Sequence, residues 1–130
     1  MRARISLLLL APLALVLSLE TARAVSLEGA WSGSGVVNPK DGQREKVRCR
    51  ISYRQESANV FGVVATCATS SVKFRQTGKL LQVNPTRYVG DFHNPEYDVS
   101  GRVRVMVRGS VQTVTFQSVR GSGSVTLRKR

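Results

Sequence analysis

One histidine and its neighbours are the residues best suited by type to do chemistry. His93 is the single histidine of the 130-residue chain, so any catalytic arrangement that needs an imidazole must use it. Asp91 could share one strand face with it, and Glu96 or Asp98 could complete a metal site. One histidine with loop carboxylates has no fixed metal-ligand spacing, and such residues are also ordinary in hairpin loops. The sequence favours a solvated loop, with Asp91 and His93 as the weaker metal-site hypothesis.

The other motifs that carry catalysis are missing from the sequence. Glu28, Asp41, Glu45 and Glu56 fall mostly in or beside turns, and no two carboxylates are placed for acid–base work. No glycine loop followed by Lys-Ser or Lys-Thr is present to hold a phosphate. We therefore expect a protein that is not an enzyme and needs no cofactor.

Two cysteines, Cys49 and Cys67, are the only ones in the chain. The segments 47–54 and 61–67 both alternate apolar and polar residues, which is the period of a half-buried strand. A hairpin that turns at 57–59 sets Cys49 opposite Cys67 on its inward face. There is no Cys-x-x-Cys spacing, so a redox pair or a metal site is disfavoured. The pattern predicts a structural disulfide.

Short strands separated by turns run through the rest of the chain. Val105 and Val114 would face each other across a turn at Gly109-Ser110, and Val125 would lie beside Val114. We expect strands at 31–37, 47–54, 61–67, 72–76, 80–83, 87–92 and 102–108, followed by two more near the C-terminus.

These strands predict an all-β fold. The expected architecture is a single antiparallel up-and-down β-barrel of eight or nine strands with one disulfide. Short connections favour this closed barrel over a sandwich, because closure keeps sequence neighbours side by side and removes the sheet edges. The glycines of 33–35 and 121–123 would permit sharp coiling of the first and last strands.

The N-terminal segment has the features of an export signal. A basic start at 1–4 precedes an apolar run at 5–19, and Ala22-Arg23-Ala24 is a small-x-small cleavage pattern. The alternative is a retained membrane anchor, but a run of about 15 residues is shorter than the roughly 20 that span a bilayer. We expect a signal peptide at 1–24, cleaved near Ala24, and a periplasmic or secreted domain at 25–130 without a transmembrane span.

The strand ends resemble the calycin superfamily of small exported barrels, which includes lipocalins, avidins and the bacterial metalloproteinase inhibitors. The residues that carry the resemblance are Gly29-Ala30-Trp31 at the first strand and Arg128-Lys129-Arg130 after the last. The resemblance implies that Trp31 packs across one barrel end against Arg128. It also implies a disulfide on neighbouring early strands, as Cys49 and Cys67 would form.

A formal charge of +12 is the remaining signal. Eight basic residues are predicted on outward strand positions and form the candidate anion-binding surface: Arg48, Arg50, Arg54, Lys73, Arg75, Arg102, Arg104 and Arg108. This surface could serve solubility alone, or it could contact an anionic envelope component or a protein partner. Export and the lack of outward aromatic platforms argue against nucleic acid. The expected function is a small exported binding protein, with an inhibitor-like protein docking on a protease or other envelope enzyme as the alternative.

Overall fold

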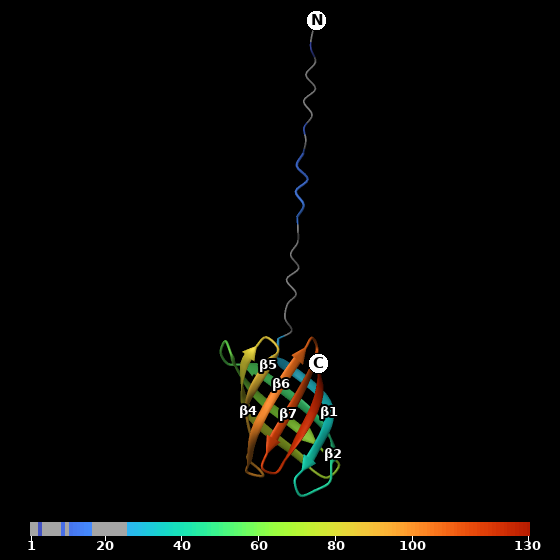
Figure 1. The fold of residues 1–130 in the computed structure, drawn as a ribbon, viewed down its shortest axis with the longest axis vertical. Helices are drawn as coiled ribbons and strands as arrows, with labels where there is room; N and C mark the ends of the chain where they lie inside the picture. The colour runs from blue at the N-terminus through green and yellow to red at the C-terminus, as the bar shows by residue number, and fades with distance from the viewer. Residues whose placement is uncertain (1–2, 4–8, 10, 17–25) are drawn as a thin grey trace.

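The computed structural model describes residues 3, 9, 11–16 and 26–130 (Figure 1). The cleavage pattern at 22–24 and most of the expected signal peptide, residues 1–24, lie outside the described residues, so both stay predictions. Within the described ranges, no helix has the length and apolar character needed to cross a membrane.

Eight antiparallel strands form a closed barrel in which each strand pairs with its sequence neighbours and β8 pairs with β1 (Figure 1). The strands are β1 (Gly29–Pro39), β2 (Glu45–Gln55), β3 (Val60–Ala68), β4 (Lys73–Asn84), β5 (Arg87–Asn94), β6 (Val99–Arg108), β7 (Val111–Ser118) and β8 (Gly121–Lys129). This arrangement confirms the all-β, up-and-down barrel and gives the strand number as eight.

The sequence predicts two strands at 72–76 and 80–83, but the structure has one continuous strand there, β4. Gly78, the expected break between them, pairs with Val63 of β3 and Phe92 of β5. A Cβ atom at Gly78 would overlap the carbonyl oxygen of Asp91, so the glycine allows close approach of the neighbouring strand. The residue adapts the strand to the barrel and does not end it.

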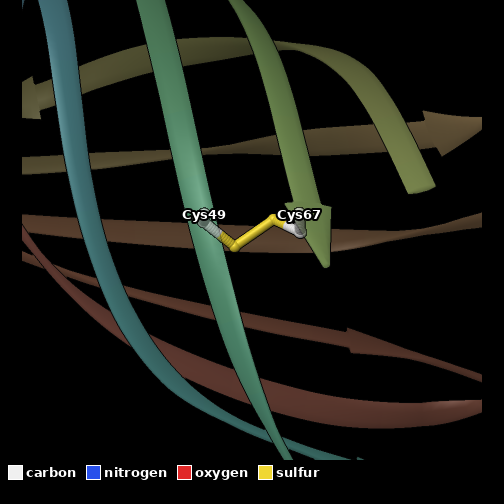
Figure 2. Close-up of a disulfide and its surroundings, with 2 residues drawn as sticks. All are labelled: Cys49 and Cys67. Carbon is white, nitrogen blue, oxygen red and sulfur yellow. A yellow bond between two sulfur atoms is a disulfide. The ribbon is translucent and has the colours of Figure 1, made fainter. Parts of the chain in front are cut away.

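The early hairpin has the predicted register. Cys49 of β2 lies opposite Cys67 of β3, and the two sulfur atoms are bonded at 2.08 Å (Figure 2). Ile51 faces Ala65 in the next inward pair. Both cysteines are buried, so the disulfide ties two neighbouring strands from inside the barrel.

The late strands also pair as expected. Val105 lies opposite Val114, and Val114 lies opposite Val125, which continues one inward face over β6, β7 and β8. Gly109 begins the two-residue turn between β6 and β7 with a φ of 58°, a left-handed conformation that favours glycine.

Pairing of β1 with β8 closes the barrel. This pairing depends on two inward glycines of β1. A Cβ at Gly33 would overlap the carbonyl oxygen of Thr126, and one at Gly35 would overlap that of Ser124. Side chains at these positions would push β8 away. The glycine pattern therefore allows the first and last strands to coil tightly against each other, as the sequence predicts.

One end of the barrel is closed by Trp31 and Leu27, which are 0% and 1% exposed. The indole Nε1 of Trp31 donates a hydrogen bond of 2.9 Å to the carbonyl oxygen of Leu27. This contact holds the segment before β1 across the barrel end, where the Leu27 side chain completes the core.

The cation that contacts Trp31 is Lys129, whereas the sequence resemblance named Arg128. The Lys129 Nζ lies 5.7 Å from the Trp31 ring centroid and donates a hydrogen bond of 2.6 Å to the carbonyl oxygen of Ser26. Arg128 is exposed, because it is one residue from the inward Leu127 and side chains alternate between strand faces.

We expect replacement of both cysteines, Cys49→Ala with Cys67→Ala, to lower the free energy of unfolding by about 3 kcal/mol, because the unfolded chain gains the freedom of an uncrosslinked loop. Urea denaturation of the oxidised protein measures the loss. Reductant should reproduce most of it in the unmodified chain and leave the double variant unchanged. Equal midpoints for the oxidised protein and the double variant would contradict a stabilising role.

We expect Lys129→Met to lower the free energy of unfolding by about 1 kcal/mol, because it removes a cation–aromatic contact and a hydrogen bond. Arg128→Met is the matched control and should change stability by less than about 0.5 kcal/mol. Urea denaturation followed by fluorescence of Trp31, the only tryptophan, measures both. A larger effect at Arg128 would restore the assignment made from the resemblance.

Candidate binding surfaces

The barrel interior is nearly filled by its own side chains. A cavity of about 40 Å³ remains in the middle, beside the Cys49–Cys67 disulfide and between Ile51, Val105 and Val125. Pockets that bury small organic molecules are roughly 300–1,000 Å³, so this space is far too small for one. The central interior is therefore a packed core.

One polar pair is buried in this core. The Tyr53 hydroxyl donates a hydrogen bond to Oε1 of Gln112, while Nε2 of Gln112 has no partner in the described part of the chain. Burial raises the pKa of Tyr53 well above its ordinary value of about 10. The hydroxyl therefore stays protonated at neutral pH and acts as a hydrogen-bond donor, not as a base or a nucleophile.

The opposite barrel end, away from Trp31, contains a larger hollow of about 380 Å³. Four aromatic side chains line it: Phe74, Phe92 and Phe116 from β4, β5 and β7, and Tyr97 from the β5–β6 turn. The rings of Phe92 and Phe116 meet edge to face with centroids 6.1 Å apart. Arg120 of the β7–β8 turn brings one cation to the same hollow and Glu45 of β2 brings one carboxylate; we call it the end hollow.

Asp91 and His93 share the outer face of β5, as the metal-site hypothesis expected. His93 belongs to the strand and not to the loop, because β5 continues to Asn94. Its Nδ1 is 2.9 Å from the Ser100 hydroxyl oxygen, and Asp91 lies in register between Lys79 and Arg102. Within the ranges that the structure describes, no group of three histidine, cysteine or acidic residues could hold a metal ion.

All eight residues of the candidate anion-binding surface are exposed on the barrel exterior. Three lie on β2, two on β4 and three on β6. Because β2 and β6 are four places apart in a closed ring of eight strands, they lie on opposite sides of the barrel. The strand order therefore puts the arginines of β2 and β6 on separate faces, and Lys73 and Arg75 of β4 lie between them in the ring.

One of these faces has a shallow hollow of about 740 Å³ across β1, β2, β3 and the start of β4. We call it the basic hollow. Four cationic side chains and four hydroxyl side chains line it, and no acidic side chain does: Arg48, Arg50, Lys73 and Arg130, with Ser32, Ser34, Ser52 and Thr66. Cross-strand pairing sets Arg50 between Ser32 and Thr66.

The sequence analysis included three of the four cations of the basic hollow and missed Arg130 and the hydroxyl residues. The serines could be found only from the β1–β2 register, which brings them beside the arginines of β2. Among the described residues, one salt bridge is present, Lys79 to Glu56 at 3.1 Å. The cations of the basic hollow thus have no carboxylate within salt-bridge distance in the described structure.

Several designed proteins share this fold. The redesigned β-barrel mFAP1, bound to DFHBI, has a TM-score of 0.67 and 14% identity over 82% of this chain and 97% of its own. The redesigned barrel b11L5F_LGL has a TM-score of 0.66 and 15% identity over 82% and 94%. A fluorescence-activating β-barrel of de novo design has a TM-score of 0.63 and 15% identity over 82% and 96%. At these identities the likeness shows the fold alone. No protein-family model and no curated protein matches the chain.

Proposed function

We propose that this chain is an exported, non-enzymatic binding protein that holds an anionic component of the cell envelope on its basic outer surface. The observation that carries the proposal is the basic hollow, where four cations and four hydroxyls gather without an acidic side chain. Export rests on the N-terminal pattern at 1–24, and the absence of enzyme activity rests on the lack of a catalytic constellation in the sequence.

The chemistry of the basic hollow fits phosphate or another oxyanion. A guanidinium group donates paired, planar hydrogen bonds that match the oxygen atoms of phosphate, and Lys73 adds a compact positive charge. Hydroxyl groups of Ser32 and Thr66, which flank Arg50, can donate further hydrogen bonds. A phosphorylated headgroup or glycan is the class of ligand that uses all of these donors.

The absence of acidic side chains matters for the electrostatics of this face. Elsewhere on the exterior, Glu56 pairs with Lys79, and Asp91 lies between Lys79 and Arg102 in the strand register. In the basic hollow no acidic side chain competes with an incoming anion. Exposed charges are screened over about 10 Å at 0.1 M salt, so binding at this face should be strongly salt-dependent.

We expect the variant Arg48→Gln, Arg50→Gln, Lys73→Gln to bind purified lipopolysaccharide about a hundredfold more weakly at low salt. Each basic residue near an anionic surface contributes about 1 kcal/mol, so three contribute about 3 kcal/mol. Titration calorimetry of the mature protein measures the affinity, and circular dichroism checks the fold.

The matched control is Lys40→Gln, Arg44→Gln, Lys46→Gln, which removes the same charge from three exposed positions that do not line the basic hollow. It should keep the affinity to within about tenfold, because only long-range attraction is lost. Equal losses in both variants would show that net charge, not the basic hollow, drives binding. Unchanged affinity in both would leave the charge a role in solubility alone.

The end hollow supports a second candidate, the binding of a small and largely apolar ligand. Its volume of about 380 Å³ lies within the range of pockets that bury small molecules, and three phenylalanine rings line it. A structural neighbour, mFAP1, is bound to the small molecule DFHBI. No contact in the described structure favours the alternative inhibitor role, which stays a prediction.

We expect anilinonaphthalene sulfonate, an aromatic anion, to bind the end hollow with a rise in fluorescence, its rings beside Phe116 and its sulfonate near Arg120. Val99→Trp places a large ring in the end hollow and should weaken binding at least tenfold. Val119→Trp is the control, because Val119 is 83% exposed and does not line the hollow. Equal dye affinity in the two variants would contradict a ligand site here.

A further inference from the structure

The outer face of β4, β5 and β6 carries apolar side chains near the barrel end that Trp31 closes, which we call the upper end. These side chains point away from the core. Leu81, Val83 and Met106 are 50%, 57% and 41% exposed, and the half-buried Val89 lies opposite Leu81. We call these four residues the upper apolar patch. Exposed apolar residues gathered on one face indicate a binding surface, whereas isolated ones need no explanation.

Arginine side chains alternate with these apolar residues. Arg104 lies opposite Val89, and Arg87 lies opposite Met106, both on the same outer face. In the next row, Asp91 lies between Lys79 and Arg102, and Lys79 is also paired with Glu56, so this row adds little net charge. The face thus combines apolar side chains with the positive charge of Arg87 and Arg104.

We propose that this face docks on the surface of an anionic lipid bilayer, with the upper apolar patch entering the headgroup region. Arginines reach phosphate headgroups while their aliphatic stems lie on apolar surface. Burial of apolar area and attraction to anionic lipids together set the strength of such interfacial binding. The inference goes beyond the proposed function, because it concerns another face and holds even if the basic hollow binds nothing.

The charges on the face select a bilayer over a second copy of the chain. A two-fold dimer through this patch would bring Arg87 and Arg104 toward the same residues of the partner, and such like-charge contacts cost several kcal/mol. An anionic lipid surface neutralises the same arginines.

Docking through this face would leave the basic hollow free. The two regions meet only on β4, where Lys73 and Leu81 are eight residues apart, or about 26 Å along an extended strand. Of the other strands of the hollow, β1 and β2 lie opposite β5 and β6 in the closed ring, and β3 is the neighbour of β4 on the side away from β5. The two surfaces can therefore be tested independently.

Sedimentation of the mature protein with vesicles tests the inference, using phosphatidylglycerol mixed with phosphatidylcholine and phosphatidylcholine alone. The variant Leu81→Thr, Val83→Thr, Met106→Thr keeps good strand formers and removes the apolar contact. We expect it to lose at least tenfold in partition onto the anionic vesicles. The control is Val119→Thr, at an exposed valine of the β7–β8 turn that lies outside the patch and the basic hollow, and it should partition like the unmodified chain.

A fluorescent reporter places the contact. Leu81→Trp should shift its emission to the blue on anionic vesicles, Val119→Trp should not, and the buried Trp31 gives a constant background. An unshifted Leu81→Trp, or equal partition of both threonine variants, would overturn the inference. Loss of vesicle binding only in Arg48→Gln, Arg50→Gln, Lys73→Gln would also overturn it while supporting the proposed function. Concentration-dependent dimers abolished by the threonine substitutions would assign the patch to a second copy.

Discussion

Closure of the sheet between β1 and β8 is the constraint on which the rest of the structure depends. The first and last strands pair over nine residues, from Trp31 with Lys129 to Pro39 with Gly121. Gly33 and Gly35 permit this contact, because a Cβ at either position would overlap the β8 backbone. Once the ring is closed, every strand has one face in the core and one face in solvent.

Closure also brings the two chain ends of the barrel together. Lys129, near the end of β8, contacts both Trp31 of β1 and the backbone of Ser26. The Arg130 amide donates to the carbonyl oxygen of Ala30. The same contacts hold Leu27 over the barrel end, so the core is capped by residues from both ends of the ring.

The alternation of apolar and polar residues was sufficient to predict the fold, the disulfide and the register of two hairpins. It worked because the inward positions of β2, β3 and β6–β8 are mostly apolar, and a shift by one residue would turn them to solvent. The alternation did not predict β4 correctly, because Gly78 suggested a break between two strands. A single sequence does not distinguish a glycine in a coiled strand from a glycine in a turn. Most of the N-terminal segment lies outside the described residues, so the export signal stays a prediction.

The candidate surfaces were harder to predict than the fold. Alternation identifies the outward arginines, but which of them meet depends on register and on the closing pair of strands. The basic hollow needs Arg130 beside β1 and β2, and the upper apolar patch needs Leu81 opposite Val89. The choice of Arg128 over Lys129 failed for a related reason, because the strand face of a residue near the end of β8 was not fixed by the resemblance.

Because the interior is packed, a functional site is to be sought on the exterior and at the barrel ends. The central cavity of about 40 Å³ is far too small for an organic ligand, so the end hollow and the outer faces are the places where the described structure has room for one. On the outer faces, seven of the eight candidate basic residues are arginine and one is lysine. Solubility alone does not require arginine in preference to lysine, because lysine carries the same charge. Added carboxylates also raise solubility more than added cations do. Arginine differs in its planar, paired donors for oxyanions and in a weakly hydrated group that can lie against apolar surface. Both properties suit surfaces that contact anionic ligands, which favours binding over solubility as the explanation for the charge.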